Sequence, residues 1–472
     1  MKRLSGWDAV LLYSETPNVH MHTLKIAVIE LDADRRDFGI DAFRRVIHSR
    51  LYKLEPFCYQ LVDIPLKLHH PMWRENCEVD LTYHVRPWRL PAPGGRRELD
   101  EAIGEIASTP LDRGHPLWEM YFVEGLANHR IAVVGKIHHA LADGVAAANL
   151  LARGMDLAPG PQRDRDAYRP DPAPTRGALL RSAFGDHLRQ LGRIPRTVGY
   201  TAQGVNRVRR STRKLSPELT RPFTPPPTFM NHMLTPDRRF ATATLALAEI
   251  KETGKQLGVT INDMVLALSA GALRKLLLRY DGNADHPLLA SVPVSFDRSP
   301  DRISGNYFTG MLVALPSDVE DPLERVRRSH DYANDAKETH QLLGPELVSR
   351  WAAYFPPAPS ESLFRWLSSR DGQNKVLNLN VSNVPGPREH GQVGGALVTE
   401  IYSVGPLTAG SGLNITVWSY VDQLNVSVLS DSATLEDPHE VTEAILDEFV
   451  EIRRAAGLSE KLTVVESAMA QA

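Results

Sequence analysis

The sequence predicts an α/β protein built of two lobes, each with a mixed sheet and helices. Stretches with strand-like patterns alternate with helical stretches, as they do in layered α/β domains. The same alternation begins again after a Pro- and charge-rich stretch at residues 158–176. A chain of 472 residues is also too long for one ordinary hydrophobic core, which suggests two domains of roughly 200 residues each.

The first lobe is expected to span residues 1–157. Its clearest strand is the run IAVVGKI at residues 131–137, which is apolar along most of its length and typical of a buried strand. The expected elements are strands over residues 20–32, 118–123 and 129–137 and helices over residues 40–51 and 99–109.

A linker or crossover region is expected over residues 158–239. Its two ends, residues 158–176 and 221–239, are Pro-rich and have little to bury. Between them, residues 187–214 hold eight basic residues and no acidic one. This basic segment is either a solvated tether between the lobes or a surface that docks on a membrane or lipid droplet, because basic residues are attracted to anionic lipid.

The second lobe is expected over residues 240–460, followed by a disordered tail over residues 461–472. Two lobes of similar construction would place a site at their interface, where pockets are common. The expected strands lie over residues 240–247, 288–294, 311–315, 376–384, 413–420 and 423–430, and the expected helices over residues 248–257, 260–280 and 438–456.

Composition and charge narrow the functional classes. The net charge of −3 gives no overall electrostatic reason to bind nucleic acid. The longest apolar helical run, residues 264–273, is shorter than the ~20 residues that a membrane span needs, and the N-terminus has no signal-peptide pattern. Cys58 and Cys77 fit neither a disulfide framework nor a metal motif. We therefore expect a cytoplasmic protein with no metal site and no phosphate-binding loop.

The strongest chemical signal is HHALADG at residues 138–144, directly after the expected buried strand. Side chains alternate between the faces of a strand, so only one of His138 and His139 can face a given cavity. Asp143 is placed to cap the helix that begins at Gly144, where a carboxylate also suits the helix dipole. A histidine at the end of a rigid strand is a natural general base for a hydroxyl nucleophile near neutral pH.

Paired histidines also occur for structural reasons, and the chain holds a second pair, His69-His70. That pair has no Asp-Gly downstream, and we expect it at the surface or in packing. The spacing HHxxxDG between a strand and a helix is much more specific than the pair alone.

This motif resembles that of coenzyme A-dependent acyltransferases of the chloramphenicol acetyltransferase type. Within that superfamily the chain resembles the bacterial wax ester synthase/diacylglycerol acyltransferase family, especially its actinobacterial members. Four further sequences along the chain match motifs of the family, in the family's order: LSGWD at residues 4–8, PLW at 116–118, ND at 262–263 and SNVPGP at 382–387. Within the first of them, many relatives have an aliphatic residue or Met where this chain has Trp7, a difference that puts nothing catalytic in doubt.

The resemblance implies a chloramphenicol acetyltransferase-like fold with an active-site tunnel between the lobes. It also implies that the second histidine, His139, is catalytic, with His138, Asp143 and Gly144 in supporting roles. The implied reaction moves the acyl group of a long-chain acyl-CoA, a cosubstrate rather than a cofactor, to diacylglycerol or a fatty alcohol. The enzyme would be cytoplasmic or peripheral on the inner face of the cell membrane or on lipid droplets.

Three rival functions remain open on the sequence. The acceptor could be an amine or a polyketide alcohol, the chain could be a condensation domain that acts on carrier proteins, or it could be a non-catalytic lipid-binding relative. Turnover and acceptor preference separate these cases.

Donors to the oxyanion of the reaction are less marked in the sequence. Asn262 lies in the first turn of an expected helix, where Thr260 and Asp263 form a capping box. Asn414 and Thr416 follow a glycine pair that would permit close backbone approach to a ligand. The strand over residues 376–384 presents Asn378, Asn380 and Ser382 on one face, which is either solvated or lines a polar channel.

Overall fold

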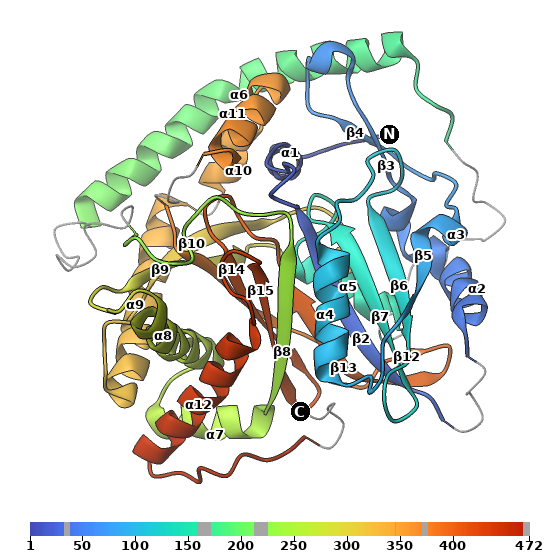
Figure 1. The fold of residues 1–472 in the computed structure, drawn as a ribbon. Helices are drawn as coiled ribbons and strands as arrows, with labels where there is room; N and C mark the ends of the chain where they lie inside the picture. The colour runs from blue at the N-terminus through green and yellow to red at the C-terminus, as the bar shows by residue number, and fades with distance from the viewer. Residues whose placement is uncertain are drawn as a thin grey trace.

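The structure, a computed structural model, describes residues 1–32, 38–155, 157, 171–211, 225–344, 346–370 and 376–465. These residues form two lobes side by side, each built on a six-stranded mixed sheet (Figure 1). The sheet of the first lobe has the strand order β12-β13-β2-β7-β6-β5, and that of the second has the order β10-β9-β11-β14-β15-β8. The predicted α/β fold with two mixed lobes is confirmed.

The first lobe forms largely as predicted. Its predicted strands appear as β2 (His22–Glu30), β6 (Trp118–Glu124) and β7 (Arg130–His138), and its helices as α2 (Ile40–Arg50), α4 (Arg96–Ala107) and α5 (Gly144–Gly154). The short strand β5 (Val85–Arg89) adds a parallel partner to β6. Trp118, of the PLW sequence, is fully buried and stacks between Phe57 and His84, so that motif is packing beneath the central strands.

The second lobe also contains every element predicted for it. Its strands are β8 (Arg238–Ala246), β9 (Leu288–Ser295), β10 (Phe308–Leu315), β11 (Leu379–Pro385), β14 (Leu413–Tyr420) and β15 (Gln423–Asp431). Its predicted helices are α7 (Leu247–Leu257), α8 (Ile261–Tyr280) and α12 (His439–Ala455), and α9 (Pro322–Leu343) is an addition. Thr260 and Asp263 form the expected capping box, which starts the almost completely buried helix α8.

The two lobes are not separate in sequence. Strands β12 (Gln392–Val393) and β13 (Ala396–Val404) lie within the range expected for the second lobe, yet they complete the sheet of the first. β13 pairs antiparallel with β2 along most of its length. The exchange has a physical reason, because β2 would otherwise be an edge strand with a row of unpaired backbone groups.

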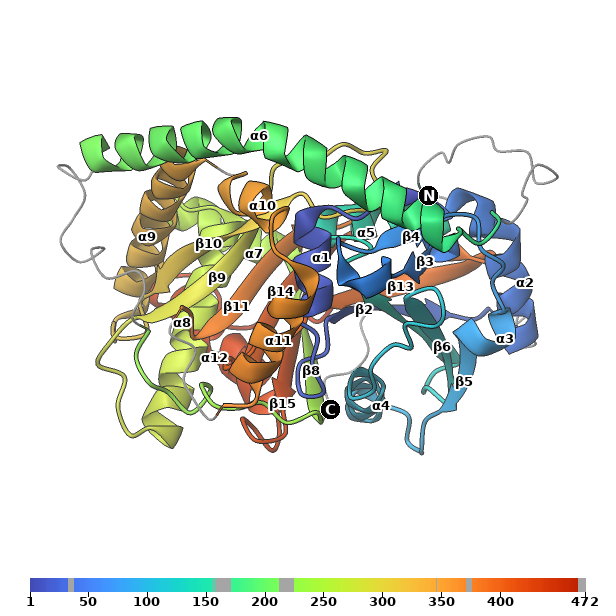
Figure 2. The same cartoon turned by 90° about the horizontal axis from the view of Figure 1, so that it is seen from above.

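Several helices lie over the interface of the lobes. The longest is α6 (Arg176–Ser211), which crosses both lobes and occupies much of the region expected as a linker (Figures 1 and 2). Its own sequence gives a weak helix signal because it contains Pro195 and five glycines. Beneath it lie α1 (Gly6–Tyr13), α10 (Leu347–Ala352) and α11 (Pro357–Ser368).

The structure describes only parts of the expected linker and of the expected tail. Residues 158–170, 212–224 and 466–472 lie outside the described residues, and residues 461–465 have no regular secondary structure. In the described part of the chain, no single helix has the length and apolar composition of a membrane span; α7 and α8 meet that test only as a pair, bent by 95°.

Candidate active site

The HHxxxDG motif lies where the first lobe meets the second. β7 ends at His138, and the backbone N–H of His139 donates to the carbonyl of Met21 on the neighbouring chain segment, at 2.8 Å. The loop after the histidines pairs with a loop of the second lobe, because Gly305 N donates to the carbonyl of Leu141 at 2.7 Å. Gly305 has φ +80°, where any L side chain would be strained. The motif is therefore held from both lobes.

The imidazole of His139 is held by an amide from the second lobe. The Nδ1 atom of His139 lies 2.9 Å from Oδ1 of Asn306. The amide nitrogen of Asn306 donates both to Oδ1 of Asp8, at 2.7 Å, and to the carbonyl of His139, at 2.8 Å. Because the carboxylate and the carbonyl only accept, the amide cannot flip. Nδ1 therefore carries the proton, and Nε2 of His139 has a free lone pair.

The surroundings also keep this imidazole neutral. Burial lowers the pKa of His139 below its ordinary value of 6.5, and the nearby charge of Lys25 lowers it further, while Asp143 and Asn306 oppose the shift. The ring packs against Phe308, with 5.3 Å between centroids, and Phe308 in turn meets Trp7 edge-on. At neutral pH the ring is thus in the form that can accept a proton.

His138 lies in different surroundings. Its Nδ1 accepts from the backbone N–H of Ala140 at 3.0 Å, and its Nε2 lies 3.0 Å from Oε2 of Glu15. Its side chain is fully buried. These contacts fix the turn that follows β7.

Asp143 caps α5 as expected, since its Oδ1 accepts from Ala146 N at 2.9 Å. The same carboxylate does more than cap. It pairs with the guanidinium of Arg302 at 2.9 Å and accepts from Tyr307 N at 2.9 Å, both in the second lobe. A Cβ added to the next residue, Gly144, would lie 3.3 Å from the side chain of Val384. This position therefore packs tightly against the second lobe.

Asn262 is not joined to the motif. It is half-buried in the first turn of α8, beside Asp263, and no hydrogen bond or ring contact among the described residues links it to either histidine. Asp263 is engaged in the capping box and in a 2.8 Å contact with His330. Nothing in the geometry assigns Asn262 to the reaction.

Asn414 and Thr416 lie on the face of β14 that is turned toward the first lobe, the same face as Trp418. The hydroxyl of Thr416 donates to Oδ1 of Asn414 at 2.8 Å, so its single proton is used. The amide nitrogen of Asn414 donates to the carbonyl of Pro406 at 3.0 Å, which leaves one N–H without an acceptor among the described residues. Of the two, only Asn414 has a donor to spare.

The polar face of β11, which the sequence left as either solvated or lining a channel, lies at the interface of the lobes. Asn380 and Ser382 alternate with Val381, which is buried in the core of the second lobe, so they face the first lobe. Both are half-buried. Val384 on the same face touches Gly144, so this face runs along the interface of the lobes toward the motif. Asn378, in contrast, is buried and bonded to Asn231 and the backbone.

Lys25 is a buried lysine near the motif that the sequence analysis did not select. Its ammonium group donates to Ser403 Oγ and lies 5.0 Å from the ring centroid of Trp418. Burial lowers the pKa of Lys25 to about 7, opposed by Asp143. A lysine in such surroundings changes charge near neutral pH and alters the field around His139.

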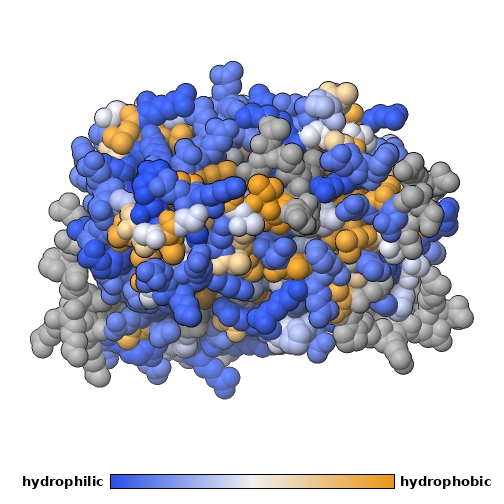
Figure 3. Space-filling view, turned by 90° about the horizontal axis from the view of Figure 1, so that it is seen from below, coloured by the Kyte–Doolittle hydropathy of each residue, from blue (hydrophilic) through white to orange (hydrophobic). Residues whose placement is uncertain are grey.

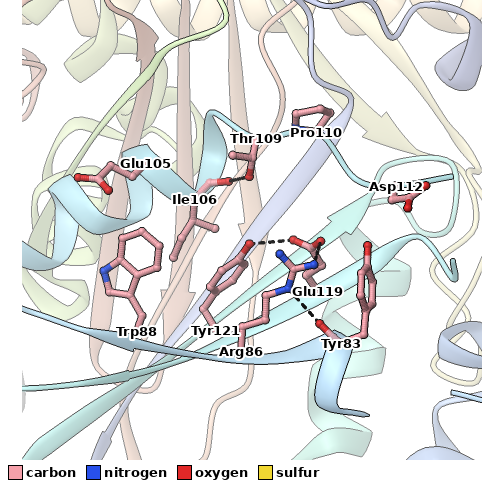
Figure 4. A pocket seen from close by; sticks show the side chains of 10 residues that line it. All are labelled: Tyr83, Arg86, Trp88, Glu105, Ile106, Thr109, Pro110, Asp112, Glu119 and Tyr121. Carbon is pink, nitrogen blue, oxygen red and sulfur yellow. Dashed lines mark hydrogen bonds and ion pairs between the residues drawn. The ribbon is translucent and has the colours of Figure 1, made fainter. Parts of the chain in front are cut away.

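A separate cavity of about 470 Å³ opens in the first lobe, between β5, β6 and the end of α4 (Figure 4). Tyr121 and Arg86 both contact Glu119 at its wall, at 2.8 and 3.0 Å. None of the motif residues lines it. In the described part of the chain, no cluster of His, Cys, Asp and Glu is placed to hold a metal ion.

The residues around His139 that sequence reasoning missed come from distant segments. Asp8 was part of a recognised opening motif, but Asn306 and Arg302 carry no local pattern that marks them. In the sequence, Gly305 directly before Asn306 is a signal of a special turn there, and its φ is +80° in the structure. His69 and His70 are both buried, and His70 bonds to Tyr13 and to the carbonyl of Ala353, which confirms packing for that pair.

Comparisons with known proteins show the family to which the chain belongs. Residues 4–265 match the wax ester synthase/diacylglycerol acyltransferase catalytic domain, and residues 304–453 match the WS/DGAT C-terminal domain. A protein of Mycobacterium tuberculosis (strain ATCC 25618 / H37Rv), provisionally named a diacylglycerol O-acyltransferase, is 78% identical over the full length of both chains. A second protein of that strain with the same kind of name is 35% identical and covers 93% of this chain and 94% of its own.

Solved structures support the same assignment. The wax ester synthase/diacylglycerol acyltransferase from Marinobacter aquaeolei VT8 superimposes with a TM-score of 0.68 at 26% identity, over 97% of this chain and all of that one. The first condensation domain of the CDA synthetase has a TM-score of 0.55 at 16% identity and covers 98% of each chain, so it shares the two-lobed fold alone. The chain is an acyltransferase that belongs to the wax ester synthase/diacylglycerol acyltransferase family.

Proposed function

We propose that this chain moves the acyl group of a long-chain acyl-CoA to the hydroxyl of diacylglycerol or of a fatty alcohol, giving triacylglycerol or wax ester. Acyl-CoA is a cosubstrate, and the reaction needs no bound cofactor. The observation that carries the proposal is the hydrogen-bond chain from Asp8 through Asn306 to Nδ1 of His139. It leaves Nε2 as the free basic atom of a neutral imidazole at the interface of the lobes.

In the proposed mechanism, Nε2 of His139 takes the hydroxyl proton while the acceptor oxygen attacks the thioester carbonyl. The tetrahedral intermediate collapses with cleavage of the C–S bond, and the imidazolium returns the proton to the departing thiolate. No covalent acyl-enzyme is required. The spare N–H of Asn414 is the proposed donor to the oxyanion, a contribution of ~3 kcal/mol where such a donor is well placed.

The test is a comparison of the two histidines. His139→Ala should lower turnover by about 10²–10⁴-fold, the contribution of a positioned acid–base group, while acyl-CoA binding and the melting temperature change little. His138→Ala should lower the melting temperature, with a smaller loss of activity per folded molecule, because it removes the contacts to Ala140 and Glu15. A folded, inactive His138→Ala beside a fully active His139→Ala would reverse the assignment.

The acceptor is decided by substrate profiling of the purified protein. Thiol release and product analysis should show preference for long-chain acyl-CoA and hydrophobic alcohols over amines and polyketide alcohols. A protein that binds these lipids without turnover would instead be a non-catalytic relative. Because such acceptors partition into lipid, we also propose that this cytoplasmic enzyme works peripherally, on the inner face of the cell membrane or on lipid droplets.

A further inference from the structure

One face of the molecule carries large apolar side chains that are exposed in the part of the chain that the structure describes. It is formed by α6, α10 and α11 (Figure 2) and by the short 3-10 helix η4 (Pro65–Lys67), which lies against α6. Exposed side chains on α6 include Leu180, Phe184, Leu188, Leu191, Val198 and Val205, and those on the other elements include Leu66, Leu68, Trp351, Leu363, Trp366 and Leu367. We call this surface the α6 face.

The apolar residues of α6 form one stripe. Their spacings of three, four and seven residues return to the same side of a helix with 3.6 residues per turn. The inward side of α6 is made by other residues, among them Leu179, Ala183 and Thr197, which are buried. Phe184 is 67% exposed and Leu191 is 62% exposed, so the stripe is directed away from the protein. Exposed apolar patches of this kind mark interaction sites.

Specific contacts hold the neighbouring elements beside the stripe. His187 bonds to the carbonyl of Leu68 at 2.8 Å, and Trp351 donates from Nε1 to Thr201 at 3.0 Å. Gln190 donates to the carbonyl of Ala353 at 2.7 Å, at the end of α10. The α6 face is therefore a continuous surface built from several elements, not the side of a lone helix.

The charges of α6 are suited to an anionic partner. Its one acidic residue, Asp186, is paired with Arg3 and Arg189. Arg181, Arg193 and Arg196 are exposed, and no carboxylate among the described residues pairs with them. Basic residues beside an apolar stripe are typical of helices that lie in the headgroup region of a lipid surface.

We propose that the α6 face docks on a lipid surface that contains anionic headgroups. The inference rests on the proposed function, because diacylglycerol and fatty alcohols reside in lipid. It adds to that function the surface that docks, the α6 face, which lies over α1, the helix that carries Trp7 and Asp8. α1 packs so closely against α10 that a Cβ at Gly6 would lie 2.2 Å from the nitrogen of Ala353.

The face opposite α6 is mostly hydrophilic, with small separate apolar patches (Figure 3).

The test compares three variants of the full chain. A stripe variant carries Phe184→Ser, Leu188→Ser and Leu191→Ser, and a charge variant carries Arg193→Gln and Arg196→Gln. The control carries Leu278→Ser, Leu397→Ser and Val464→Ser, which are also exposed aliphatic positions but lie outside the α6 face. Co-sedimentation is measured with vesicles of phosphatidylcholine alone and of phosphatidylcholine with phosphatidylglycerol. Turnover is measured with a short-chain acyl-CoA and a water-soluble alcohol.

The stripe variant should bind both kinds of vesicle at least about tenfold more weakly, because it loses three large apolar side chains. The charge variant should bind phosphatidylcholine vesicles like the wild type but lose the additional binding that phosphatidylglycerol gives. The control should bind both kinds of vesicle like the wild type. Turnover of soluble substrates should be the same in all four proteins. Absence of turnover with long-chain acyl-CoA and a hydrophobic alcohol from all four would refute the proposed function and leave the vesicle result to stand by itself. Wild-type binding by the stripe variant overturns the docking proposal. So does light scattering that shows the α6 face holding two copies of the chain together while vesicle binding is unchanged.

Discussion

At the scale of single residues, the site depends on which atom of His139 carries the proton. Two acceptors fix the orientation of the Asn306 amide, and the amide fixes the tautomer of the imidazole. Asp8 is buried, which raises its pKa, although hydrogen bonds from Asn306 and Ser5 lower it. The three side chains come from the N-terminal helix, the motif loop and the second lobe.

Removal of this amide should affect catalysis more than stability. Asn306→Ala should lower kcat by about 10–100-fold, because a base displaced by ~1 Å loses about that much rate, with little change in KM for acyl-CoA. Asn149→Ala is the matched control, since its amide also bridges the lobes, to the carbonyls of Ser299 and Arg302, without touching His139. Equal kcat losses in both variants would assign Asn306 a purely structural role.

The pH dependence follows from the lowered pKa of His139. The base acts when neutral, so kcat/KM should rise with pH as the imidazole of His139 loses its proton. Its acid limb should have a midpoint below 6.5. Lys25→Met removes a positive charge that lowers this pKa, so the midpoint should move upward. A midpoint above 6.5 in the wild type would contradict a base that is neutral at pH 7 because of its surroundings. Steady-state rates across pH, with melting checked at each end, provide the measurement.

At the scale of elements, α5 and the loop before β10 act as one unit. Asp143 caps the helix and also pairs with Arg302 across the lobes. The sequence indicates the cap alone, a contribution of ~1 kcal/mol. The ion pair is buried, with side chains 2% and 8% exposed, and breaking a buried pair costs more because one charge is left behind.

Asp143→Ala should therefore destabilise the protein by about 3–5 kcal/mol. Asp321→Ala is the control, because Asp321 caps α9 through Glu324 N at an exposed position and has no cross-lobe partner among the described residues. It should cost ~1 kcal/mol. Denaturant unfolding of both variants measures the difference. Similar losses would mean that the Arg302 pair adds nothing beyond the cap.

At the scale of the whole molecule, β13 ties the lobes together. Arg96 on α4 pairs with Glu400 on β13 at 3.3 Å and donates to Thr242 on β8 at 3.0 Å. The arginine is 4% exposed. Each lobe thus contributes side chains to one buried polar network, and the first sheet is incomplete without a strand from the second half of the chain.

We expect the lobes to unfold in a single transition, with equal calorimetric and van't Hoff enthalpies. Arg96→Ala should shift that whole transition downward by about 1.5–3 kcal/mol, since it removes a buried charge-assisted contact with Glu400, which keeps only its pairing with Arg130 at 3.4 Å and its bond from Tyr402. Arg97→Ala, beside it, should cost at most ~1 kcal/mol, because Arg97 is 46% exposed where it pairs with Asp437 and Glu443. Two resolved heat-capacity peaks, or a shift confined to one of them, would contradict the coupling of the lobes.

The sequence by itself determined the elements whose causes are local. Strand β7, the capped helices α5 and α8 and the motif between them follow from apolar runs and capping residues, and the ordered motifs indicated the family. The tertiary structure alone decided the partners of those elements. Asn306 and Arg302 reach the motif on the loop before β10, and Asp8 reaches it on α1, and no periodicity records such long-range contacts. Helix α6 was missed because tertiary contacts, rather than its own propensity, hold it in place.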